Sequence, residues 1–132
     1  MTEVPEPDAK AAAEVLEGRE RLAGAVSEAL AAAGLTVHRG EFADAGVLVW
    51  VDPRADDYGG VYARWAVGRA LQDELLAALR EQDLAAPVVR RRGEAVAAMN
   101  EAVRRVLVAF GMRAESFRDD FVSPCVRVRE VA

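Results

Sequence analysis

The sequence predicts an α+β fold: an antiparallel sheet of about four strands packed against three helices, in the order α-β-β-α-α-β-β. Three long segments carry apolar residues at helical spacing. In two shorter regions the residues are either continuously apolar or alternate between apolar and polar over the length of a typical strand. One of these regions precedes the middle of the chain and the other ends it. Helices gathered on an antiparallel sheet are a common way for such elements to bury their apolar faces.

Composition is typical of a folded protein, because 52% of the 132 residues are hydrophobic and 30% are charged. Pro5 and Pro7 predict a loose N-terminal tail over residues 1–7, and we expect residues 8–132 to form a single α+β domain. No apolar run approaches bilayer-spanning length, the acidic N-terminus does not resemble a secretory signal, and one cysteine excludes an internal disulfide. We therefore expect a cytoplasmic protein without membrane contacts.

The first helix is expected to begin after Asp8, a candidate N-cap, and to end at Gly34. Leu22, Val26 and Leu30 mark its apolar stripe. At about 1.5 Å per residue this helix would be close to 40 Å long, more than a small sheet covers. Its excess length suggests a partner helix.

A β-hairpin is predicted next, from residues 35–42 and 46–52. Residues 47–51 are all apolar, which favours a central strand that is covered on both faces. A second helix is predicted over residues 61–82 and a third over residues 93–110, where Gly111 is a natural C-terminal residue. Residues 112–117 and 124–131 are expected to form the last two strands.

The loop after the apolar strand contains the strongest candidate for a binding site. Carboxylates at the end of a strand can converge on a divalent cation, and aromatic side chains often line small-molecule pockets. The spacing of the acids matches no calcium loop, and Asp-Pro is a common turn opener, so we predict no metal site or cofactor. The alternative interpretation, a small enzyme or a ligand- or cation-binding protein, places its pocket here, with His38 or Arg64 at the rim; its lining would be Asp52, Asp56, Asp57, Tyr58 and Tyr62.

Other reactive residues lack a recognisable catalytic context. His38 is the single histidine and Cys125 the single cysteine, and no nucleophile motif accompanies them. We expect His38 on the surface and Cys125 as a small buried hydrophobe. The basic run at residues 90–92 belongs to a chain of net charge −5, so we do not expect nucleic acid among its partners.

These observations favour a small acidic protein without enzymatic activity that acts through protein–protein contacts. The excess helix length and the 3-4 apolar spacing of the third helix point to another protein chain as partner. We expect a homodimeric adaptor or accessory protein.

Overall fold

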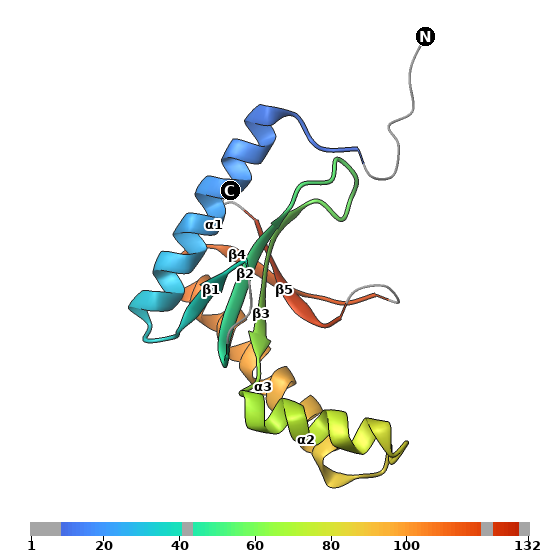
Figure 1. Ribbon diagram of the computed structural model, residues 1–132. Helices are drawn as coiled ribbons and strands as arrows, with labels where there is room; N and C mark the ends of the chain where they lie inside the picture. Colours follow the sequence, from blue (N-terminus) through green and yellow to red (C-terminus); the bar gives the residue numbers. More distant parts are fainter. Residues whose placement is uncertain (1–8, 41–43, 120–122, 130–132) are drawn as a thin grey trace.

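The computed structural model describes residues 9–40, 44–119 and 123–129, and these form an α+β fold. The helices are α1 (Ala13–Ala32), α2 (Arg69–Arg80) and α3 (Pro87–Ala109). The strands are β1 (Val37–Arg39), β2 (Gly46–Asp52), β3 (Gly60–Ala66), β4 (Arg113–Phe117) and β5 (Cys125–Arg129). They form one five-stranded sheet in the order β1-β2-β3-β5-β4 (Figure 1).

The sheet is mixed rather than purely antiparallel. The expected hairpin of residues 35–42 with 46–52 is wrong, because β1 runs parallel to β2, with Val37 opposite Val47. Gly40 and Gly46 both have positive φ angles, which let the chain loop back to the start of β1 instead of reversing directly. A Cβ atom on Gly46 would lie 2.6 Å from the Thr36 carbonyl oxygen, so this close approach requires glycine.

Strand β3 replaces the predicted beginning of the second helix at residue 61. Val61, Ala63 and Trp65 pack toward the helices, whereas Tyr62 and Arg64 lie on the opposite face, as expected for a strand. All seven residues of β3 pair with β2 in an antiparallel register. Helix α2 therefore starts only at residue 69, and the order of elements gains one strand.

Helices α1 and α3 cover one face of the sheet and enclose the core (Figure 1). Val26 and Leu30 from α1 meet Val103 and Leu107 from α3 above the inward side chains of the strands. The other face carries no helix among the described residues, so the expected cover on both faces of β2 is not found. Helix α2 packs on α3 and lies beyond the end of the sheet.

The two long helices differ from prediction at their N-termini. Helix α1 has 20 residues, or about 30 Å, and starts after Ala12 without a side-chain cap; the expected cap, Asp8, lies outside the described residues. Residues 9–11 instead pair with the loop after β2, where Ala11 N donates to the Pro53 carbonyl. Helix α3 begins at Pro87 rather than residue 93, because proline suits the first turn of a helix. Its end before Gly111, which has a φ of 87°, is as predicted.

Candidate functional site

The loop between β2 and β3, residues 53–59, is where the sequence placed a possible pocket. Asp52 ends β2 and forms an ion pair with Arg54 at 2.7 Å, and the Arg54 backbone N–H also donates to its carboxylate at 3.0 Å. Partial burial on its own raises the pKa of Asp52, but the hydrogen bonds and charge of Arg54 outweigh burial and lower it. The carboxylate is thus already engaged by its own loop.

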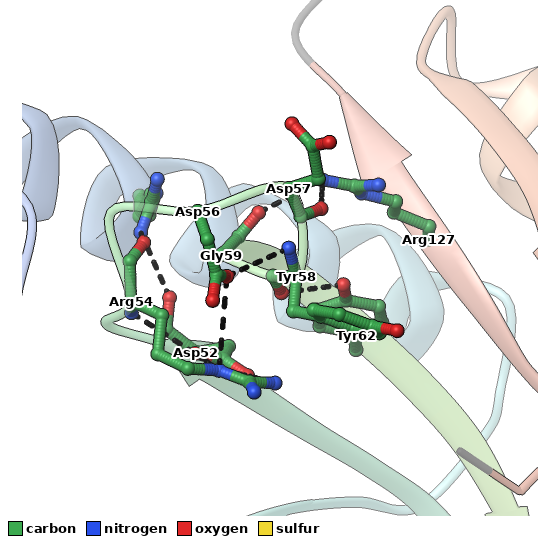
Figure 2. Close-up of polar contacts among 9 residues, drawn as sticks. Asp52, Arg54, Asp56, Asp57, Tyr58, Gly59, Tyr62 and Arg127 are labelled. Atoms are coloured by element: carbon green, nitrogen blue, oxygen red, sulfur yellow. Dashed lines mark hydrogen bonds and ion pairs between the residues drawn. The ribbon is translucent and has the colours of Figure 1, made fainter. Parts of the chain in front are cut away.

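Two arginines that are distant in sequence hold the backbone of this loop, and Figure 2 shows one of them, Arg127, beside Asp57 and Gly59. Arg19 of α1 donates to the carbonyls of Asp52 and Arg54, both at 2.9 Å. Arg127 of β5 donates to the carbonyls of Asp57 and Gly59, at 2.6 and 2.9 Å. Charged donors make strong hydrogen bonds to carbonyls, so the loop is tied to both a helix and the far strand.

The three acids do not gather around a common point. Asp56 accepts a hydrogen bond from the Tyr58 backbone N–H at 2.9 Å, and it lies 4.0 Å from the Arg54 guanidinium. The Asp57 carboxylate points away from Asp52 and Asp56 in Figure 2. Within the described part of the chain, no group of three Asp, Glu, His or Cys side chains is placed to hold a metal ion.

The two tyrosines do come together, and they join a larger aromatic group on the open face of the sheet. Tyr62 donates its hydroxyl hydrogen to the Tyr58 carbonyl at 2.6 Å and is only 3% exposed. The Tyr62 ring stacks on Trp50 with centroids 5.4 Å apart and contacts Phe117 of β4 at 5.5 Å. Trp50 therefore lies with Tyr62 on the face of the sheet opposite the core, whereas Trp65 packs against the core.

Three arginines lie over these rings. Arg54 is 4.8 Å from the Tyr58 centroid, Arg64 is 5.6 Å from Trp50, and Arg127 lies between Tyr62 and Phe117 at 5.8 and 5.4 Å. Guanidinium groups at such distances are attracted to aromatic faces. We call this set the arginine–aromatic surface; it comprises Trp50, Arg54, Tyr58, Tyr62, Arg64, Phe117 and Arg127.

Sequence reasoning missed Phe117 and Arg127 as members of this surface. The outward positions of β2, β3 and β5 alternate with the core positions, and that alternation is the signal that could have identified Tyr62, Arg64 and Arg127 together. The assignment of residues 61–66 to a helix concealed the alternation.

The two other residues considered for catalysis lie apart. His38 is on β1, and β2 and β3 separate that strand from Cys125 on β5. Cys125 is buried as predicted, and burial raises the pKa of its thiol to about 11, so the thiol is protonated near neutral pH. His38 is half-buried, with Nε2 3.2 Å from the Ala45 carbonyl oxygen.

The basic run at residues 90–92 does not form one continuous patch. Arg90 pairs with Glu94 at 3.5 Å and Arg91 with Glu74 of α2 at 3.7 Å. Arg92 turns inward, and its Nε atom is buried. Further along α3, Arg104 pairs with Glu101 at 2.6 Å, one helical turn away.

None of the described helices has the length and apolar character needed to cross a bilayer. Comparison with protein-family models, with curated proteins and with solved structures yields no match to this chain.

Proposed function

We propose that this protein acts through protein–protein contacts and pairs with a second copy of itself through α2. One observation carries the proposal: α2 is an amphipathic helix in which no residue is buried. Leu76 and Leu79 are 38% and 41% exposed, and Leu84 in the following turn is 71% exposed. Apolar side chains that gather on one exposed helix are typical of an interface.

The contrast with the other helices supports this assignment. Val26 and Leu30 of α1, and Val103 and Leu107 of α3, are at most fractionally exposed because those helices lie on the sheet. Helix α2 has α3 on one side and stands beyond the end of the sheet. Val15 of α1 and Val108 near the end of α3 are also exposed, but most of the apolar stripes of α1 and α3 is covered within the subunit, whereas α2 has no buried residue.

Opposite charges at the two ends of the α2 segment suit an antiparallel pairing of two copies. Arg69 begins α2 and Asp83 lies in the turn after it, at equal distances in sequence from Leu76, and within the described residues neither side chain has an ion-pair partner. A two-fold interface centred on Leu76 would bring Arg69 of each copy toward Asp83 of the other, because in such interfaces residue i contacts residue j and j contacts i. Full burial of a wholly exposed leucine contributes about 1.5–3 kcal/mol, so Leu76 and Leu79, which are 38% and 41% exposed, would each contribute roughly 0.6–1.2 kcal/mol per copy.

Sedimentation equilibrium of the full chain between about 1 and 100 μM, the range of ordinary protein affinities, tests the proposal. We expect a mass of twice 14.2 kDa that dissociates on dilution. The double variant Leu76→Glu/Leu79→Glu should be a folded monomer. Val15→Glu, at a residue of α1 that is 46% exposed, is the matched control and should remain dimeric. A monomeric parent chain, or equal loss of the dimer in the control, would refute the proposal.

A further inference from the structure

A hollow of about 380 Å³ lies where the end of β3 meets α2 and α3. Its volume falls in the range of small-molecule sites, roughly 300–1,000 Å³. Two arginines and the amide of Gln72 supply its polar lining, together with the serine that precedes β5. Leu48, Val67 and Val96 form apolar walls, and no Asp or Glu is among the described residues that line it.

Arg92 is the first of the two arginines. Its Nε atom is buried and finds no hydrogen-bond acceptor among the described residues. Its neighbours Arg90 and Arg91 each have a glutamate partner, so the lack of one is particular to the arginine that turns inward. Buried polar groups in folded proteins are nearly always satisfied, and a charged donor without an acceptor calls for one.

Arg64 is the second. It projects from the open face of β3, where its guanidinium lies 5.6 Å from the Trp50 ring centroid. Within the described part of the chain it has no carboxylate within ion-pair distance. The aromatic ring restricts the position of the guanidinium without neutralising its charge, which leaves its N–H groups available to an anion.

Asn100 fixes the framework around this hollow. It is 8% exposed, and its side-chain oxygen accepts from the Trp65 backbone N–H at 2.8 Å while its nitrogen donates to the Pro124 carbonyl at 3.2 Å. Trp65 and Pro124 both line the hollow, so α3 holds the ends of β3 and β5 around it. Both the oxygen and the nitrogen of its side-chain amide are thus engaged by the protein.

We propose that this hollow binds a small organic oxyanion, with a carboxylate or phosphoryl group between Arg64 and Arg92 and a short apolar body against Leu48, Val67 and Val96. Guanidinium groups bind both kinds of oxyanion through paired hydrogen bonds. The apolar walls give the ligand a hydrophobic part, and Gln72 offers an additional donor and acceptor. This site involves neither the Asp52–Tyr62 loop nor the exposed leucines of α2.

Isothermal titration of the full chain with phenyl phosphate, benzoate and phenol tests the site, with proton–nitrogen NMR spectra of the arginine Nε and tryptophan indole groups. We expect saturable binding of at least one of the two anions, none of neutral phenol, and shifts of the Arg92 Nε–H and Trp65 indole signals. Arg92→Gln and Arg64→Gln should each weaken binding at least about tenfold, since hydrogen bonds to charged groups contribute roughly 1.5–3 kcal/mol.

Arg90→Gln is the matched control, because it removes the same charge from the adjacent solvent-facing position, where the side chain is 85% exposed. It should bind as the parent chain does. No saturation by either anion up to about 10 mM, a range that captures even weak complexes, would overturn the proposal. Equal weakening by Arg90→Gln, or binding of phenol as strong as that of the anions, would overturn it as well. Thermal melts show whether each variant is folded. If one of Arg92→Gln and Arg64→Gln fails to fold, the binding measured for the other tests the proposal.

Discussion

Asn100 offers the sharpest test of how the helices and the sheet are joined. This residue of α3 bridges β3 and the residue before β5 through two hydrogen bonds, to the Trp65 N–H and the Pro124 carbonyl. Asn100→Ala removes both of these hydrogen bonds at once and leaves the Trp65 N–H and the Pro124 carbonyl without Asn100 as a partner. Trp65 is partly buried and packs against the core, so its N–H has few alternative partners, whereas Pro124 is exposed and its carbonyl can bind water instead.

The cost can be estimated from these two contacts. An unsatisfied buried backbone donor costs about 1–3 kcal/mol, and the loss of the exposed-side bond adds about 0.5–1 kcal/mol. We therefore expect Asn100→Ala to lower the free energy of unfolding by about 1.5–4 kcal/mol. At roughly 4 °C per kcal/mol for a chain of this length, the melting temperature should fall by about 6–16 °C.

Urea unfolding monitored by tryptophan fluorescence and circular dichroism measures this loss. Glu101→Gln is the control, because Glu101 is the next residue along the helix but forms an exposed pair with Arg104, so it should change stability by less than about 1 kcal/mol. A loss below about 0.5 kcal/mol for Asn100→Ala would show that neither bridging bond stabilises the junction, and the reasoning would be refuted.

Three further predictions concern the loop after β2 and the buried thiol. Gly59→Ala should destabilise the fold by about 2 kcal/mol or more in urea titrations, because a Cβ there would lie 1.9 Å from the Arg54 carbonyl oxygen; unchanged stability would contradict the loop geometry. Asp52→Asn should be less stable than the parent above about pH 4, where the carboxylate is ionised and is stabilised in the folded state by Arg54, which lowers its pKa. That difference should shrink as the pH falls through the pKa of the folded state, and a difference independent of pH would contradict the assignment. Cys125 should react slowly with a thiol reagent at pH 8 and rapidly in denaturant, since burial raises its pKa to about 11; fast labelling of the native chain would count against this.

Local sequence patterns were sufficient to predict several of the helices and strands. The 3-4 spacing through Val96, Val103 and the residues between them predicted α3, and the apolar run after Gly46 predicted β2. The ends of elements were harder to predict. The start of α3 at Pro87 was missed, because proline is common both in loops and at the first position of a helix.

Strand β3 shows why periodicity failed locally. Val67 lies four residues before Leu71 and Ala63 four residues before Val67, so the helical pattern extends backward from α2 into β3. The same stretch also alternates, with Tyr62 and Arg64 on one side and the core residues on the other. Pairing with β2 decides between these two periods, and pairing is a long-range property that local sequence does not reveal.

The candidate loop was identifiable, but what holds it was not. Asp52 and Asp56 were visible as acids beside a buried strand, and their partner Arg54 is also local. Arg19 and Arg127 reach the loop from a helix and a strand far away in the sequence. Only the packing of α1 and the position of β5 beside β3 bring them there.

Site-specific disulfide trapping tests the pairing of α2 most directly. The natural thiol, Cys125, is buried, so a cysteine introduced at Leu76 is the accessible one under mild oxidation. We expect Leu76→Cys to form a disulfide-linked dimer of twice 14.2 kDa, whereas Val108→Cys, at a residue 48% exposed on α3, should not. Failure of Leu76→Cys to cross-link, or cross-linking at Val108 to the same extent, would contradict the account.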